Sequence, residues 1–293
     1  MRQAVASATN KFITWGIVAI LVLMPFHAFF SIYLGSLGVS QFAVQSWKES
    51  LIILMAICWA MYSLARNKIP IKLDSVNITF LTIIGFSLLV TIFINPGVKP
   101  VLFGIKTNLV ALALFFIAQV PIAKSSFLKR NIKWLIVIPA VVVAILAILQ
   151  GTLIPPDWLT KLGYNATTIN PKQIVDGSLG FYRAFSTLGG PNQLGAYLIL
   201  PLVFVLTYAI REKNPYLGIL ALPILGGIFL SFSRSAWIGS AVAAFICITI
   251  SLNKRYRTVF LVTSLVSASV VAIIFFNLAS TNQKFQNILL HGR

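Results

Sequence analysis

The feature that most constrains this chain is a series of long, continuously apolar segments separated by short stretches with charge, proline or glycine. A helix that crosses the roughly 30 Å hydrocarbon core of a bilayer needs about 20 such residues. The apolar residues do not alternate as they do in barrel strands, so the segments predict helices. We therefore expect an all-α, polytopic α-helical membrane protein with a single membrane domain over residues 1–293.

Nine segments meet this description, and we expect each to be a transmembrane helix. They cover residues 12–33, 51–65, 76–94, 101–120, 134–150, 194–210, 216–232, 236–252 and 259–278. The first segment is too long for the core of a signal peptide and no small-residue cleavage site follows it, so it should remain as an anchor. Composition agrees, because only 10% of the residues are charged, whereas a soluble domain carries about 25%.

The basic residues predict the orientation of the chain. It holds 23 Lys and Arg against 5 Asp and Glu, a net charge of +18. In a soluble chain this excess would suggest nucleic acid, but in a membrane protein it first reports topology. With a cytoplasmic N-terminus, fourteen of the basic residues fall inside and eight outside. Residues 151–193 then form an extracytoplasmic loop, residues 279–293 begin a second one, and no nucleic-acid partner is expected.

Arg183 is the first candidate site residue. It lies near the end of the long loop, close to the outer interface, and is followed by the turn at residues 189–192. Asn192 in that turn is expected to cap the next helix and leave backbone N–H groups pointing outward. A helix N-terminus beside an arginine is a good phosphate site. The alternative is an interface arginine that snorkels, followed by an ordinary turn.

Arg234 is the second candidate. It lies in the short external hairpin between the seventh and eighth segments, against the positive-inside bias, and Ser231, Ser233 and Ser235 flank it as small donors. This arrangement suggests an anion held at the membrane surface. The alternative is a helix-end arginine that faces lipid phosphates. If both arginines bind one pyrophosphate, their guanidinium groups must lie within roughly 10 Å of each other.

Polar groups inside the predicted helices are few. Lys106 and Asn108 interrupt the fourth segment near its outer end, and Lys106 either snorkels or faces the same anion. No segment contains a carboxylate, which argues against a carrier coupled to protons or sodium and against a carboxylate-bound metal. Cys58 and Cys247 lie inside apolar runs, so they predict neither a disulfide framework nor a metal site.

At these stretches the sequence resembles the O-antigen ligase-like family, which includes Wzy-type O-antigen polymerases. Members show an arginine followed by a Gly/Ser-Thr-Phe-Gly-Asn-Pro-Asn-x-Leu-Gly stretch, and residues 183–198 follow this pattern with Leu188 and Gly190 as departures. Residues 230–239 resemble the family's later Ser-Arg hairpin. Residues 104–109 resemble its Gly-Leu-Arg segment, with lysine in place of arginine.

The resemblance implies a glycosyltransferase of the bacterial plasma (inner) membrane. It would move a glycan from undecaprenyl pyrophosphate to a glycan, lipid or protein acceptor on the extracytoplasmic face. Arg183 and Arg234 would bind the pyrophosphate and act catalytically by stabilising its growing negative charge, with Lys106 and Asn192 as further binding residues. Because these cations supply the charge, neither a metal nor a cofactor is expected. Ligase and polymerase share these motifs, so both remain open.

The resemblance also implies a chain that continues through further spans. Family members carry a large external loop with a histidine that activates the acceptor, and His291 lies too close to the membrane exit to be assigned that role. We therefore expect this chain to be truncated, and to bind the carrier but turn over poorly. The competing interpretation is a non-enzymatic membrane transporter of a small anion or lipid-linked glycan that uses the same arginines.

Overall fold

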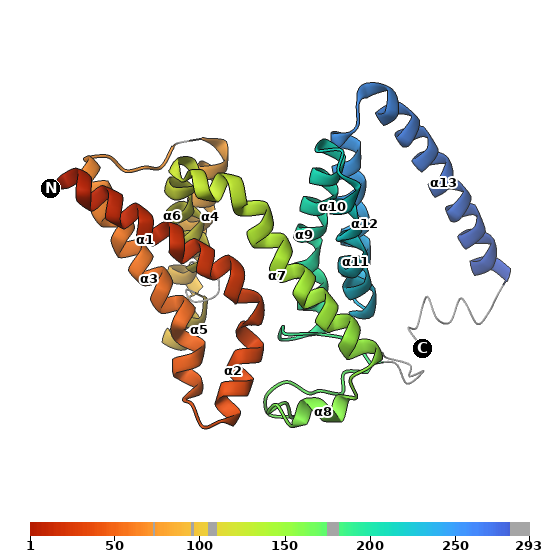
Figure 1. Ribbon diagram of the computed structural model, residues 1–293, viewed down its shortest axis with the longest axis horizontal. Helices are drawn as coiled ribbons and strands as arrows, with labels where there is room; N and C mark the ends of the chain where they lie inside the picture. Colours follow the sequence, from red (N-terminus) through yellow and green to blue (C-terminus); the bar gives the residue numbers. More distant parts are fainter. Residues whose placement is uncertain (73, 95–96, 105–109, 175–181, 282–293) are drawn as a thin grey trace. The chain divides into compact units, whose positions relative to one another are not determined.

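The computed structural model describes residues 1–293 except 73, 95–96, 105–109, 175–181 and 282–293 (Figure 1). The described residues form helices and their connections, with one isolated bridge between Ile174 and Tyr182 and no sheet. The predicted all-α class is confirmed. The chain divides into an N-terminal unit, Met1–Met24 with Val39–Leu135, and a C-terminal unit, Pro25–Gly38 with Ile136–Arg293.

Helix is present in every one of the nine predicted segments. In chain order the elements are α1 (Arg2–Leu23), the 3-10 turn η1 (Met24–Phe26), α2 (His27–Ser36), α3 (Gln41–Arg66), α4 (Ser75–Ile94), α5 (Val98–Gly104), α6 (Val110–Lys124), α7 (Ser126–Thr152), α8 (Pro156–Thr160), α9 (Pro191–Arg211), α10 (Pro215–Ile219), α11 (Ala221–Leu230), α12 (Arg234–Ser251) and α13 (Lys254–Thr281).

Among the described residues, six helical stretches are long and apolar enough to cross a membrane, which makes this a multi-pass membrane protein by length and hydropathy. They are Arg2–Ser36, Gln41–Arg66, Ser75–Ile94, Ser126–Thr152, Pro191–Arg211 and Arg234–Ser251. Two other apolar stretches, Val110–Lys124 and Pro215–Leu230, are shorter. The total of nine spans therefore stays a prediction.

Some helices extend beyond the predicted membrane segments, where polar residues continue the helix. The second segment was expected at 51–65, yet α3 is 26 residues long and begins at Gln41. Its N-terminal extension includes an ion pair between Lys48 and Glu49, with 3.1 Å from Nζ to Oε1. Charged residues at a membrane interface can stay helical because water and headgroups solvate them. For the same reason α7 begins at Ser126, eight residues before the predicted start.

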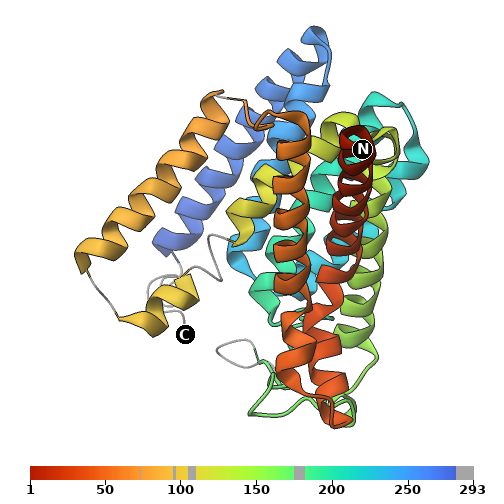
Figure 2. The same ribbon diagram turned by 90° about the vertical axis from the view of Figure 1, so that its left-hand side faces the viewer.

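The N-terminal unit is built on contacts among α1, α3 and α6 (Figure 2). Ile13 and Ile17 of α1 pack with Met55 of α3 and Ile117 of α6 in one buried cluster. A second small cluster joins Ala6, Tyr62 and Val120. At the same end of the unit, the Asn77 amide oxygen accepts a hydrogen bond of 2.6 Å from Gln119 Nε2. Such amide pairs satisfy polar groups that lipid cannot.

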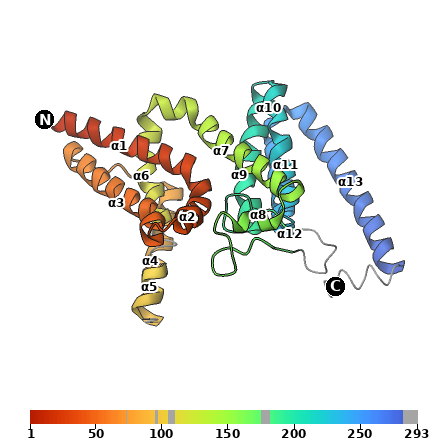
Figure 3. The same cartoon turned by 60° about the horizontal axis from the view of Figure 1, so that its bottom comes forward.

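The C-terminal unit is built around the second half of α7 together with α9, α11 and α12 (Figure 3). Helices α9 and α12 lie side by side and run in the same direction. Gly195 meets Ala236 near the start of both helices, and Thr207 Oγ1 lies 2.9 Å from Cys247 Sγ further along. The N-termini of α9 and α12 therefore reach the same end of the unit.

Replacing Gly195 with alanine should force α9 and α12 apart. The added methyl group would overlap the Ala236 side chain and lie 3.1 Å from Ser231 Oγ, and such overpacking costs about 1–3 kcal/mol. Thermal unfolding in detergent should show a lower midpoint for Gly195→Ala. Gly190→Ala is the matched control, because a methyl group there meets nothing within 4 Å. Equal midpoints for the two variants would contradict the close packing of the two helices.

Candidate functional site

The Arg183 side chain connects the start of α9 to the hairpin between α11 and α12. Its Nη2 donates a hydrogen bond of 2.8 Å to Asn192 Oδ1, and its Nε donates one of 3.1 Å to the Ser231 carbonyl oxygen. Its backbone N–H also donates to the Gln173 carbonyl at 2.7 Å. A guanidinium has five N–H donors, so three are left over after these two side-chain bonds. Arg183 therefore fixes three segments and still has donors for a ligand.

Arg234 is the first residue of α12 and lies next to this connection. The hairpin before it has only three residues, and Phe232 at its centre adopts a left-handed conformation with a φ of 47°. The Arg234 side chain is exposed and makes no hydrogen bond or ion pair with any described residue. Arg183 donates to the carbonyl of Ser231, which lies three residues before Arg234 in the sequence. The two cations therefore belong to the same end of the unit. The 10 Å separation stays a prediction.

Two helix N-termini add positive potential at this end. Neither Gly190 before α9 nor Ser233 before α12 makes a side-chain capping bond. The first-turn N–H groups of a helix without such a cap carry a partial positive charge and attract anions. Both helices start beside an arginine, and the close approach of Gly195 to Ser231 and Ser233 keeps their starts together. This end is suited to bind a phosphate or pyrophosphate group.

The structure corrects the predicted role of Asn192. The residue does not cap α9, because the helix already begins at Pro191 with Gly190 as its N-cap. Proline is favoured at the first helical position since its missing N–H has no partner there anyway. The Asn192 side chain instead accepts the bond from Arg183. It orients the arginine, and whether it also contacts a substrate stays a prediction.

The predicted serine donors are also corrected in part. Ser231 and Ser233 are buried, at 0% and 2% exposure. Ser231 Oγ donates to the Ile228 carbonyl and accepts from the Ser233 N–H, so its hydroxyl stabilises the turn. Only Ser235 is exposed. Lys106, Asn108 and His291 lie outside the described residues.

The backbone after Arg183 has no regular structure, yet residues 184–187 are buried. Gln150 Oε1, near the end of α7, accepts hydrogen bonds from the N–H groups of Phe185 and Ser186 at 3.0 and 2.6 Å. The Ser186 hydroxyl donates to the Val143 carbonyl at 2.7 Å, and its backbone is left-handed with a φ of 55°. Irregular backbone in an apolar bundle requires such partners. We call this set of contacts the Gln150 clamp.

Thr187 extends these contacts to the break between α1 and α2. Proline has no N–H and interrupts a helix, and Pro25 lies inside the 3-10 turn. In a continuous helix the Phe29 N–H would bond to the Pro25 carbonyl. Instead the Phe29 N–H donates to the Thr187 carbonyl at 3.2 Å, and Thr187 Oγ1 donates to the Pro25 carbonyl at 2.8 Å. Sequence reasoning missed Gln150 and Thr187; the one available signal was a glutamine at the end of an apolar segment.

In the described part of residues 151–193, the one carboxylate already has a cationic partner. Asp157 pairs with Lys172 at 2.8 Å between Oδ1 and Nζ. This hydrogen bond raises the pKa of the Lys172 ammonium. Among the described residues no group of three or more His, Cys, Asp or Glu could hold a metal ion. The charges beside the site are therefore mainly positive.

Comparisons with protein-family models, with curated proteins and with solved structures find no match for this chain.

Removing the Gln150 acceptor should destabilise the segment that carries Arg183. Gln150→Leu leaves two buried N–H groups without partners, at about 1–3 kcal/mol for each. Gln150→Glu keeps an acceptor oxygen and serves as the matched control. Hydrogen exchange of residues 183–188 should accelerate in Gln150→Leu and stay slower in Gln150→Glu. If both variants exchange like the wild type, the clamp does not hold this segment.

Tyr164 packs against Phe185. We expect its buried hydroxyl to make the folding stability of the protein fall at high pH. Its hydroxyl is buried without a hydrogen-bond partner among the described residues, and burial raises its pKa to about 12. The unfolded chain loses this proton near pH 10, so the folded state loses stability between about pH 10 and 12. Tyr164→Phe should remove this dependence at little cost at pH 7, as unfolding measured across that range would show. An unchanged pH profile would contradict this assignment.

Proposed function

We propose that this chain is a membrane glycosyltransferase of the O-antigen ligase or polymerase type, with undecaprenyl pyrophosphate-linked glycan as donor. The observation that carries the proposal is the Arg183 guanidinium, bonded at once to Asn192 at the start of α9 and to the hairpin that presents Arg234. Both residues come from the motifs that resemble this family. Pyrophosphate is the ligand that two arginines and two helix N-termini suit best.

The proposal includes a sidedness. In the C-terminal unit, the end opposite the site carries Arg211, Lys213, Lys254, Arg255 and Arg257. The positive-inside rule places such an end in the cytoplasm, and the site then faces the extracytoplasmic side. With nine spans and a cytoplasmic N-terminus, this is the topology of a plasma-membrane enzyme that receives a lipid-linked glycan outside the cytoplasm.

The proposed reaction is transfer of the glycan to an acceptor hydroxyl. The acceptor oxygen forms a bond to the anomeric carbon, the bond from that carbon to the phosphate oxygen breaks, and the acceptor proton passes to a general base. Negative charge grows on the pyrophosphate as the bond breaks. Arg234 and the remaining donors of Arg183 stabilise that charge more strongly in the transition state than in the bound donor. Lys106 stays a further candidate for the same anion.

Arg234→Lys is the sharpest test, because the Arg234 side chain has no hydrogen-bond or ion-pair partner to lose among the described residues. Lysine keeps the charge but not the planar fork of donors. Removing such a stabilising contact lowers turnover about 10²–10³-fold. Transfer of labelled glycan from the lipid pyrophosphate in vesicles should fall in this range, and retention of undecaprenyl pyrophosphate by the purified chain should also fall. Lys129→Ala, a basic residue in the N-terminal unit, should change neither.

Arg183→Lys should lower binding and transfer as well, but it also removes the bonds to Asn192 and Ser231. Its unfolding midpoint must therefore be measured beside its activity. Unchanged carrier binding in Arg234→Lys would contradict the proposed site. Uptake of an anionic solute into proteoliposomes, without any label transfer between donor and acceptor, would favour the transporter instead.

A further inference from the structure

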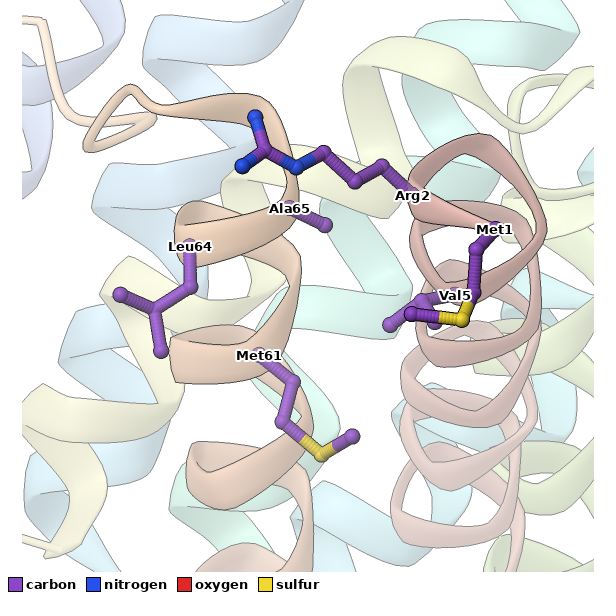
Figure 4. A pocket seen from close by; sticks show the side chains of 6 residues that line it. All are labelled: Met1, Arg2, Val5, Met61, Leu64 and Ala65. Atoms are coloured by element: carbon purple, nitrogen blue, oxygen red, sulfur yellow. The ribbon is translucent and has the colours of Figure 1, made fainter.

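A second site lies in the N-terminal unit, at the end where α1 begins and α3 ends. A groove of about 300 Å³ opens there, lined by Met1, Arg2 and Val5 of α1 and by Met61, Leu64 and Ala65 of α3. Apart from Arg2, its lining side chains are apolar. Figure 4 shows Val5, Met61 and Ala65 directed into the space between the two helices, with Arg2 extending across its end towards α3.

The groove begins where the packing of the two helices ends. Ala6 and Tyr62 are the buried pair nearest to it, and Ala65, which lines the groove, packs against the same small cluster. Met61 is 44% and Leu64 75% exposed. Both helices belong to stretches long and apolar enough to span a membrane, and the groove lies at one end of each stretch, where headgroups and the first carbons of the acyl chains would meet the protein. The shape and the apolar lining of the groove therefore suit one lipid acyl chain.

The charges around the groove select the headgroup. Arg2 is exposed and makes no hydrogen bond or ion pair with any described residue. Arg66 follows Ala65 directly and Lys68 lies two residues further on, and both are exposed. Asp74 is the one carboxylate in this part of the sequence, and its Oδ1 already accepts the Asn77 N–H at 2.8 Å. A cationic rim above an apolar groove complements an anionic phosphate above an acyl chain.

We propose that this groove binds one anionic phospholipid of the leaflet that faces the basic end of the unit. One acyl chain lies between Val5 and Met61, and Arg2 donates to the lipid phosphate, with Arg66 and Lys68 adding to the attraction. The site fixes the start of α1 and the end of α3 to the membrane surface. It is independent of the glycosyltransferase proposal, because it uses none of the same residues.

Native mass spectrometry of the full chain tests this proposal, with phosphatidylglycerol and phosphatidylcholine of identical acyl chains as probes. The wild type should retain phosphatidylglycerol in preference to phosphatidylcholine. Arg2→Ala should lower the affinity for phosphatidylglycerol about fivefold, which corresponds to about 1 kcal/mol for one basic residue. Lys11→Ala is the matched control, because Lys11 is an exposed cation on the same helix that does not line the groove. It should bind like the wild type.

Two further variants test whether the acyl chain binds in the groove. Ala65→Trp fills the groove and should lower retention of both lipids, and Met61→Gln makes its wall polar and serves if the first variant does not fold. Equal binding of the two lipids would overturn the proposal. Equal losses of phosphatidylglycerol affinity in Arg2→Ala and Lys11→Ala would also overturn it, because the attraction would then come from the overall charge. Unchanged lipid retention in both Ala65→Trp and Met61→Gln would overturn it as well.

Discussion

The C-terminal unit depends on satisfying backbone polar groups where no water reaches them. Residues 184–187 are buried without helical bonds, and the Gln150 clamp and Thr187 supply the partners that a helix would have provided. An unpaired buried N–H or carbonyl costs about as much as several good packing contacts gain. These few hydrogen bonds therefore decide where Arg183 lies, and Arg183 in turn brings the start of α9 to the hairpin before α12.

The fold class could be predicted from the sequence because hydrocarbon leaves so few options. A run of apolar residues in a bilayer must be helical or part of a closed barrel, and uninterrupted runs select the helix. Helix ends were less predictable. The start of α3 at Gln41 and of α7 at Ser126 depends on polar residues that remain helical in the interface, and hydropathy does not detect these.

The candidate site could be predicted only in part. Arg183 stood out because a turn and a predicted helix start follow it, and Arg234 because it lies against the positive-inside bias; the structure brings their segments together through Ser231. The bond between Asn192 and Arg183 was not predictable, since it depends on the start of α9 at Pro191 rather than on residue type. Gln150 accepts hydrogen bonds from residues that lie 35 and 36 positions further along the chain. Only the tertiary packing shows such a contact.

The bond between Thr187 and Pro25 has a consequence for biosynthesis. It joins residues 162 positions apart, and a ribosome adds about 5–20 residues per second. Roughly 8–30 s therefore pass after the first helix emerges before its partner exists. During that time the Pro25 carbonyl and the Phe29 N–H lack the partner that they have in the final structure, and the two groups can bond to each other as in a continuous helix. The break between the first two helices can therefore take its final form only after the ribosome has added Thr187, which makes it a late step in the folding of a segment that is among the first to be synthesised.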